Sequence, residues 1–372
     1  MYGFFGEGVE MKRLLPALAV LLALLCAGSG VARAETVQAG DLNGDGAVTA
    51  GDAAKTLRAA CGTETLNAAE SAMADVTGNM EVGGADATAI LLLVTGRLNS
   101  FSDLSVLSPD SLLGEKHLEQ FSYLGIILKN NGYRSDRVSV SVSQHTQGEF
   151  VYDLADIYVQ SIESMHTAFG GGAYLAGREE TQKIAADNGA ILAINGDGYS
   201  NRKLGPLVRN GVWYRESVDP DYDLCVLYRD GSLVTYDAGS VSLETLQEND
   251  VYQTWTGGPR LLDDTGEPLE AFHCARSLNS HSARTVIGYY EPGHYCFVTV
   301  DGTQNPASTG ATLDDLAELL ASLGCKAAYC LFGGNSSVMT TQTQVINTVK
   351  NGGRTVSDIV YLCEPVGTNG GE

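Results

Sequence analysis

The clearest pattern of hydrophobic positions lies near the end of the chain, between Thr312 and Gly324. Four leucines recur there at helical spacing and therefore share one face of a helix: Leu316, Leu319, Leu320 and Leu323. Thr312 with Asp315 forms a capping-box start, and Gly324 is a typical stop. The pattern predicts a helix whose apolar face packs in the core.

Short apolar runs alternate with helical segments along the preceding part of the chain. A helix over 179–188 leads into a buried strand at 190–194, and the runs 284–290 and 294–300 flank Pro292-Gly293 as a hairpin. A further short strand covers 327–332. Three strands thus end in glycine-containing polar turns, where backbone N–H groups and side chains can face a ligand: Asn195-Gly196-Asp197, Asp301-Gly302 and 333–337.

A different pattern occupies the front of the chain, where oxygen-bearing side chains alternate in the segment DLNGDGAVTAGD. Its possible ligands stand at positions 1, 3, 5, 7, 9 and 12 of a calcium loop, the seventh through a backbone carbonyl: Asp41, Asn43, Asp45, Ala47, Thr49 and Asp52. Gly46 lies at the sharp turn of such a loop. Because a hard cation needs about six to eight oxygen ligands, this spacing predicts a calcium site.

The calcium loop is repeated 34 residues later in a weaker form, with ligands at Asp75, Thr77, Asn79 and Asp86. Met80 replaces the turn glycine and Gly83 offers no side-chain ligand, so a turn that no longer holds calcium is the alternative for this copy. Each copy runs into a helix-like segment, ending at Cys61-Gly62 and Thr95-Gly96. The period indicates a duplication.

Two such loops, each followed by a helix and closed by Asp, resemble a dockerin domain over residues 37–98. The resemblance implies a small all-α, calcium-folded module that docks onto a cohesin module of a scaffold or surface protein. The small residues Ala50-Gly51 and Gly84-Ala85, just before the helices, would form the docking contacts. A purely structural calcium-stabilised spacer is the alternative.

The N-terminus predicts export. Lys12 and Arg13 precede the apolar run 14–25, and Ala32-Arg33-Ala34 supplies the small residues of a signal-peptidase site. Residues 1–34 are therefore interpreted as a signal peptide that starts at Met11. We expect a bacterial protein that is secreted or associated with the cell surface, without a membrane span, because no later apolar run has the required length of about 20 residues.

Charge and cysteine spacing exclude other classes. A formal net charge of -22 disfavours nucleic-acid partners, since phosphate backbones would be repelled. The cysteines form no CxxC pair, and no histidine has a second histidine three or four residues away, so local spacing indicates no zinc site.

The motifs AINGDGYS, SARTVIGYY, VTVDGTQNPASTGATLDDLAELLASLG, CLFGGNSSVM and GGRTVSDIVYL, in this order, resemble the phosphodiester glycosidase family over residues 130–365. The resemblance implies a mixed-sheet α+β catalytic domain at 116–366, after a linker at 99–115. It also implies a hydrolase that removes a sugar from a glycosyl-1-phosphodiester, a reaction linked in bacteria to exopolysaccharide or cell-envelope glycans. No cofactor for catalysis is indicated.

Matching the motifs residue by residue places catalytic roles on Asp301, Arg284 and Asn195. Arg284 would hold the phosphodiester through its guanidinium fork, and Asp301 would serve as acid or base at the leaving oxygen. The matched substrate-binding residues are Gly196, Asp197, Gly302, Gly333, Gly334 and Ser336. Each of these is also common as an ordinary turn residue or ion-pair partner, and the joint order of the motifs favours the functional interpretation.

The sequence departs from the family at one turn, where Cys330 and Phe332 replace an Asn and an Asp. A carboxylate expected at the site is therefore missing. The alternative function is a catalytically impaired relative that binds phosphorylated glycans. A two-carboxylate glycosidase is a third possibility, although no motif of its own supports it.

Overall fold

The computed structural model describes residues 38–77, 82–101, 111–114, 116–122, 126–129, 131–274 and 279–365. The predicted signal peptide and Asn79 lie outside these ranges. In the part that is described, no helix is both long and apolar enough to cross a membrane.

The front of the chain forms three helices, α1 (Ala50–Ala60), α2 (Ala68–Ala74) and α3 (Gly84–Val94). The first and third follow the two loops and end where the sequence predicts, at the caps Cys61 and Thr95. Helix α2 was not predicted; it starts at a capping box between Asn67 and Glu70. A small core holds the three helices together: Leu42, Ala53, Ala74 and Ile90.

The larger region is built around a seven-stranded sheet with strand order β1-β2-β3-β4-β13-β12-β14. The bounds are β1 (Ile127–Lys129), β2 (Gly132–Arg134), β3 (Val138–Gln147), β4 (Phe150–Val159), β12 (Arg284–Glu291), β13 (His294–Val300) and β14 (Ala327–Cys330). Every pairing in this sheet is antiparallel. The predicted hairpin is confirmed, with Val286 opposite Val298 across β12 and β13.

The larger region also contains three smaller sheets. The strands are β5 (Met165–Phe169), β6 (Leu192–Asn195), β7 (Leu207–Arg209), β8 (Val212–Arg215), β9 (Leu224–Tyr228), β10 (Leu233–Tyr236), β11 (Val251–Thr256), β15 (Met339–Thr340) and β16 (Asp358–Leu362). They pair in the orders β15-β6-β16-β5, β10-β9-β11 and β7-β8. The confirmed fold is thus mixed α+β with antiparallel sheets, preceded by a helical module.

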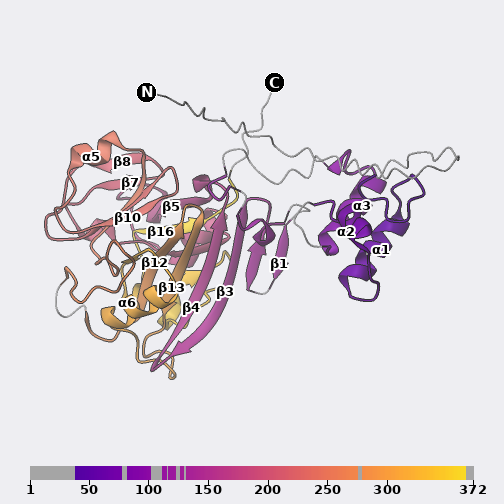
Figure 1. Cartoon of the computed structure of the whole chain (residues 1–372). Coiled ribbons are helices and arrows are strands. Elements are labelled where there is room, and N and C mark those ends of the chain that lie inside the picture. The colour runs from indigo at the N-terminus through magenta and orange to yellow at the C-terminus, as the bar shows by residue number, and fades with distance from the viewer. Residues whose placement is uncertain are drawn as a thin grey trace, which may run out of the picture.

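Three α-helices complete the larger region: α4 (Thr181–Asp187), α5 (Leu243–Glu248) and α6 (Leu313–Ser322). Short 3-10 turns occur at Leu118–Gln120, Ile162–Ser164, Gly170–Gly172, Tyr199–Asn201, Gly334–Ser336 and Lys350–Gly352. Helix α6 has the predicted Thr312–Asp315 capping box, and its leucines are buried. Figure 1 shows α6 beside β12 and β13.

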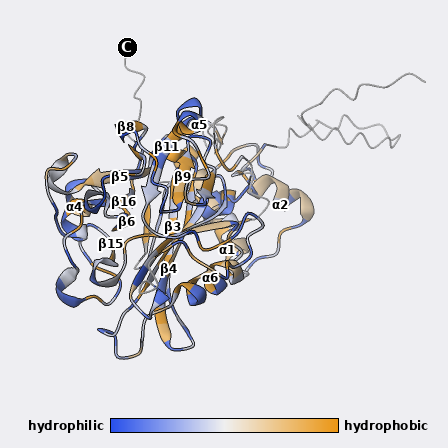
Figure 2. Cartoon of the chain, turned by 90° about the vertical axis from the view of Figure 1, so that its left-hand side faces the viewer, coloured by the Kyte–Doolittle hydropathy of each residue, from blue (hydrophilic) through white to orange (hydrophobic). Residues whose placement is uncertain are grey.

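The two faces of the large sheet bury separate cores. One face packs with α6 through residues such as Val286, Val298 and Leu316. The opposite face packs against the smaller sheets, through residues such as Ile157, Phe297 and Trp255. Figure 2 shows hydrophobic residues along strands such as β9 and hydrophilic residues concentrated in the outer loops. β13 and β14 are both antiparallel to β12, which lies between them, so they run in the same direction. The turns that follow β13 and β14 therefore lie at the same end of the sheet.

Candidate functional site

The turn after β6 and the turn after β14 are joined by hydrogen bonds around Asn195. The Asn195 amide nitrogen donates to the Phe332 carbonyl at 2.6 Å, and its oxygen accepts from Thr285 Oγ1 at 2.7 Å and from the Val338 amide at 3.2 Å. Asn195 is fully buried. Its amide therefore holds the two turns in register rather than facing a ligand.

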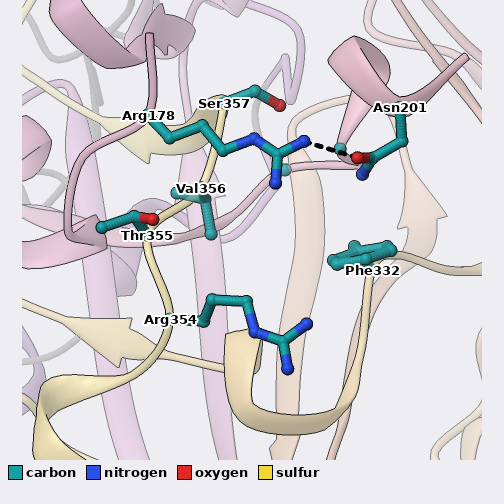
Figure 3. A pocket seen from close by; sticks show the side chains of 9 residues that line it. Arg178, Asn201, Phe332, Arg354, Thr355, Val356 and Ser357 are labelled. Carbon is teal, nitrogen blue, oxygen red and sulfur yellow. Dashed lines mark hydrogen bonds between the residues drawn. The ribbon is translucent and has the colours of Figure 1, made fainter.

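A pocket of about 160 Å³ opens where these turns meet. It is lined by Arg178, Gly196, Gly198, Asn201, Phe332 and residues 354–357. Figure 3 shows the guanidinium groups of Arg178 and Arg354 facing this pocket, with the Phe332 ring beside them. We call it the arginine pocket.

The two arginines give the arginine pocket a positive lining. Arg178 donates to Asn201 Oδ1 at 2.5 Å and to Ser200 Oγ at 3.2 Å, which fixes its direction. Within the described ranges, no carboxylate forms an ion pair with Arg178 or Arg354. In a chain with a formal charge of -22, two arginines without an acidic partner at one pocket favour an anionic ligand.

Glycines keep the arginine pocket open. Gly198 has φ +67°, and a Cβ atom there would lie 3.0 Å from Asn201 Nδ2 and 3.4 Å from the Phe332 ring. A Cβ atom on Gly196 would lie 2.4 Å from the Asp358 carboxyl. Glycine at both positions lets the backbone approach a ligand and the groups beneath it.

Beneath Gly196, two buried aspartates flank one buried arginine. Arg209 Nη2 lies 2.9 Å from Asp197 Oδ1 and 2.8 Å from Asp358 Oδ2, and all three side chains are at most 3% exposed. Asp197 also accepts hydrogen bonds from the Tyr199 and Thr256 amides. This buried ion triad ties the turn after β6 to β7 and β16, so Asp197 lies under the pocket and not on its surface.

Burial changes the acid–base behaviour of Asp358. Removal from water raises the pKa of Asp358 to about 6, although the neighbouring Arg209 guanidinium opposes the shift. A carboxyl group with such a pKa changes its ionisation close to neutral pH.

A second pocket of about 200 Å³ lies on the other side of the turn after β14. Its lining includes Gly302 and Gly334 from the predicted turns, together with His281, Asn335 and Thr348. No Asp or Glu side chain lines either pocket. Both pockets therefore share the turn that carries Phe332, and neither presents a carboxylate directly.

Asp301 lies buried beside the second pocket. Its carboxylate accepts the Thr348 amide at 2.9 Å and Asn305 Nδ2 at 2.8 Å. Asp153 on β4 is also buried, and burial together with the Asp301 charge raises the pKa of Asp153 to about 6. The charge of Asp301 therefore acts on the carboxyl group of Asp153.

The remaining predicted residues are sequence neighbours of residues that line the second pocket, but they do not line it themselves. Arg284 is 5% exposed and donates to the backbone carbonyls of Ala311, at 3.1 Å, and Ser280, at 2.5 Å. Gly333 packs closely on the Ala283 carbonyl, which would lie 3.0 Å from a Cβ atom. Ser336 is buried, and its hydroxyl has no hydrogen-bond partner among the described atoms.

The first calcium loop has the geometry of an oxygen-rich turn. Asp41 and Asp52 are 3% and 1% exposed, and among the described residues neither forms an ion pair. Asp41 accepts the Gly44 and Gly46 amides. Buried carboxylates without a cationic side chain fit a bound hard cation, and the loop residues Asn43, Asp45, Ala47 and Thr49 supply further oxygens.

The second loop repeats part of this arrangement. Asp86 is fully buried and accepts hydrogen bonds from the Thr77 hydroxyl and the Gly83 amide. Asp52 accepts the Thr49 hydroxyl and amide in the same manner. Asp75 is the cap of α2, and the ligand predicted at Asn79 lies outside the described residues. In each loop the closing aspartate, Asp52 or Asp86, therefore also lies in the first turn of the helix that follows.

Sequence reasoning missed the two arginines that face the arginine pocket and the buried Asp358 beneath it. Arg354 and Asp358 both occur in the motif GGRTVSDIVYL, but they were not assigned roles. Arg178 lies in a loop before α4 that carries no motif. No local signal in the sequence marks the two arginines, since Arg178 is followed directly by Glu179 and Glu180.

Comparison with known proteins agrees with this architecture. Residues 188–363 match the family described as phosphodiester glycosidase, and residues 39–91 match the dockerin type I domain. The uncharacterized SPbeta prophage-derived protein YomE of Bacillus subtilis is 27% identical over 225 residues, which cover 59% of this chain and 34% of YomE. The chain therefore spans about a third of the length of this curated relative.

Solved structures also resemble the chain. The catalytic domain of zebrafish N-acetylglucosamine-1-phosphodiester alpha-N-acetylglucosaminidase, auto-inhibited by its pro-peptide, gives a TM-score of 0.50 at 21% identity, covering 61% of this chain and 83% of that one. A hypothetical protein from Synechocystis gives a TM-score of 0.45 at 13% identity, covering 61% and 62%. The zebrafish likeness concerns the fold alone.

Proposed function

Because the chain contains a phosphodiester glycosidase family domain and carries a dockerin type I domain ahead of it, we propose that it is an exported hydrolase that releases a sugar from a glycosyl-1-phosphodiester. The proposed substrates are exopolysaccharide or cell-envelope glycans. The zebrafish enzyme of similar fold is named for a bond of this class.

The observation that carries this proposal is the arginine pocket. A phosphodiester keeps one negative charge, and Arg178 and Arg354 offer two guanidinium groups to its oxygens. The planar fork of arginine matches phosphate geometry better than a lysine does. The Gly198 backbone leaves room for the sugar phosphate to approach. A neutral glycoside carries no negative charge with which the two arginines could interact.

For acid–base chemistry we propose Asp301 with its neighbour Asp153. A carboxyl pair in which one pKa lies near 6 holds a proton that can be given and taken back close to neutral pH. Asp301 is fully buried, so this role requires a ligand in the second pocket to open the contact between Asp301 and the Thr348 amide. Arg284 and Asn195 then act as positioning residues, which hold the pocket walls and the turns.

The alternative function is binding of phosphorylated glycans without turnover. It is favoured by one specific observation: Phe332 faces the arginine pocket where the family has a carboxylate, and neither pocket is lined by an acidic side chain. In this case the arginines would hold the phosphate, and no group would protonate the leaving oxygen.

Two measurements on the same ligands separate the two functions. The purified protein is incubated with a panel of sugar-1-phosphodiesters, released sugar is quantified, and binding is followed by calorimetry. The hydrolase proposal expects release that depends on Arg354. Tight binding without release, lost in Arg354→Ala, would instead support the binding protein. Neither binding nor release by any member of the panel would reject both.

The dockerin domain implies a cohesin partner, and dockerin domains of this type typically bind calcium. We propose that calcium is held by the two loops described above and that the module attaches the hydrolase to a cohesin on a scaffold or surface protein. The two closing aspartates, each at the start of a helix, would couple calcium binding to helix formation.

The proposed domain limits remain 37–98 and 116–366, separated by a linker at 99–115. The family matches fall within them. The proposed start before residue 188 is supported by β4, which lies in the middle of the seven-stranded sheet and pairs with both β3 and β13.

A further inference from the structure

Away from both pockets, two histidines and a glutamate meet at the tip of the β12–β13 hairpin. Glu291 ends β12, His294 begins β13, and His117 comes from the segment 116–122. One ligand atom of each residue lies within 4.8 Å of one ligand atom of the other two. The three side chains are 14–29% exposed, so they are partly shielded but reachable by an ion from solvent.

We propose that His117, Glu291 and His294 form a zinc site that fastens the segment after the linker to the catalytic domain. The donor set is two imidazoles and one carboxylate, which suits zinc, whereas calcium takes oxygen ligands. Such three-residue sites complete a tetrahedron with water. The site therefore selects a different metal from the calcium loops of the dockerin domain.

The distances are close to those required. His117 Nε2 lies 3.1 Å from Glu291 Oε1. Two ligands at about 2.0–2.1 Å from a tetrahedral zinc ion are about 3.3 Å apart. His117 and Glu291 therefore already have the separation of a ligand pair, and a ligand atom of His294 lies within 4.8 Å of both.

One ring nitrogen of His294 has a carboxylate partner, as is usual for metal-binding histidines. Its Nε2 atom lies 2.8 Å from Asp156 Oδ1, which leaves Nδ1 for an ion. Its ring is stacked between Tyr158 and Tyr290, with centroid distances of 4.1 Å and 4.2 Å. A carboxylate on the second nitrogen fixes the tautomer and direction of a metal-bound imidazole.

One positive group stands nearby, since Lys116 Nζ lies 2.5 Å from Glu291 Oε2. The lysine side chain is 65% exposed and can turn into solvent, and Glu291 Oε1 faces His117. Glu119 Oε1 lies 4.0 Å from His117 Nδ1 and adds a negative charge on the outer side.

A second His/Asp group offers an internal control. Asp223, Asp237 and His273 also lie close together, but Arg260 donates to Asp237 and Asp223 accepts the Arg260 and Ala238 amides. With a guanidinium in place and the carboxylates occupied, this group should not hold zinc. The side chains of this group lie as close together as those of the proposed site, but their ligand atoms already have other partners.

The test uses the untagged full chain, stripped of metal and kept in excess calcium so that the dockerin loops are filled. Zinc chloride is titrated by calorimetry, and cobalt is substituted to record the visible spectrum of a tetrahedral site. We expect one zinc ion per chain. His294→Phe keeps the stacked ring without nitrogens, and His117→Gly suits the positive φ of 59° at that position.

Each of these ligand variants should weaken zinc binding by more than about 100-fold, and Asp156→Asn by about 10- to 100-fold. His273→Ala should bind zinc like the unmodified protein. Unaltered tryptophan fluorescence in the absence of zinc checks that each variant folds. Three results would overturn the proposal: no zinc binding at a zinc concentration of about 100 micromolar, unchanged zinc affinity in His294→Phe, or loss of zinc binding in His273→Ala.

Discussion

The buried ion triad allows a quantitative prediction about stability. In Arg209→Met the new side chain fills part of the space of the arginine but carries no charge. Asp197 and Asp358 lose the guanidinium group that lies 2.9 Å and 2.8 Å away, and their side chains are only 3% and 0% exposed. Removing one partner of a buried ion pair costs about 3–5 kcal/mol, because a charge is left uncompensated. We expect a loss of this size in the free energy of unfolding at pH 8.

The loss should depend on pH in a defined direction. Burial already raises the pKa of Asp358 to about 6, and Arg209 holds it down, so the variant has a still higher pKa. A carboxyl whose pKa is raised by folding contributes stability that is present below its unfolded pKa, about 4, and is lost as pH rises through the folded pKa. Between pH 6 and 8 the variant should lose up to about 1.4 kcal/mol more per pH unit than the unmodified protein.

Tryptophan fluorescence during urea unfolding is the appropriate assay. Trp213 and Trp255 are the two tryptophans of the chain, and both lie in the larger domain, so the dockerin module does not contribute. Arg229→Met is the matched control, because its ion pair with Glu163 has side chains 41% and 48% exposed and is worth at most about 1 kcal/mol. Equal losses at pH 6 and pH 8 in Arg209→Met, or a loss no larger than in the control, would refute the reasoning.

Three further predictions concern other parts of the molecule. Asp41→Ala should abolish most of the calcium dependence of the circular dichroism and protease resistance of residues 37–98, and a module that ignores chelation would contradict the calcium assignment. Phe332→Asp should raise turnover of a glycosyl phosphodiester, because a positioned acid or base contributes about 10²–10⁴-fold to a rate. Phe332→Ala is the control for the effect of the cavity alone, and a fall in turnover in Phe332→Asp would show that the site depends on the ring. Asp153→Asn should raise the free energy of unfolding more at pH 7.5 than at pH 4.5, since the pKa of Asp153 is raised to about 6 and its ionisation in the folded state is unfavourable; urea titrations at both pH values measure the difference, and an equal change would contradict it.

Local patterns predicted much of the fold. The capping box at Thr312 with its leucine stripe, and the hairpin around Pro292-Gly293, depend on neighbouring residues, and the structure contains both. Helix α2 was missed because it is short and follows no hydrophobic period; Asn67 and Glu70 were its available signal.

The site was predictable only in part, because it is assembled from distant segments. The turns at Gly196, Gly302 and Gly334 line the two pockets, as their order in the chain suggested. Arg178 and Arg354 are 176 positions apart in the sequence, and no local pattern indicates that they meet. The same holds for His117 and His294, whose proximity follows from the packing of segment 116–122 on the hairpin.

The central claim is that the substrate carries a phosphodiester and that the arginine pocket recognises it. The most direct measurement compares kcat/KM for a glycosyl-1-phosphodiester with that for the matched glycoside without phosphate, in the unmodified protein and in Arg354→Ala. A lost hydrogen bond to a charged group is worth about 1.5–3 kcal/mol, so we expect an about 10- to 100-fold fall for the phosphodiester in the variant and negligible hydrolysis of the neutral glycoside by either protein. Equal rates on both substrates, or a phosphodiester rate unchanged by Arg354→Ala, would contradict the account.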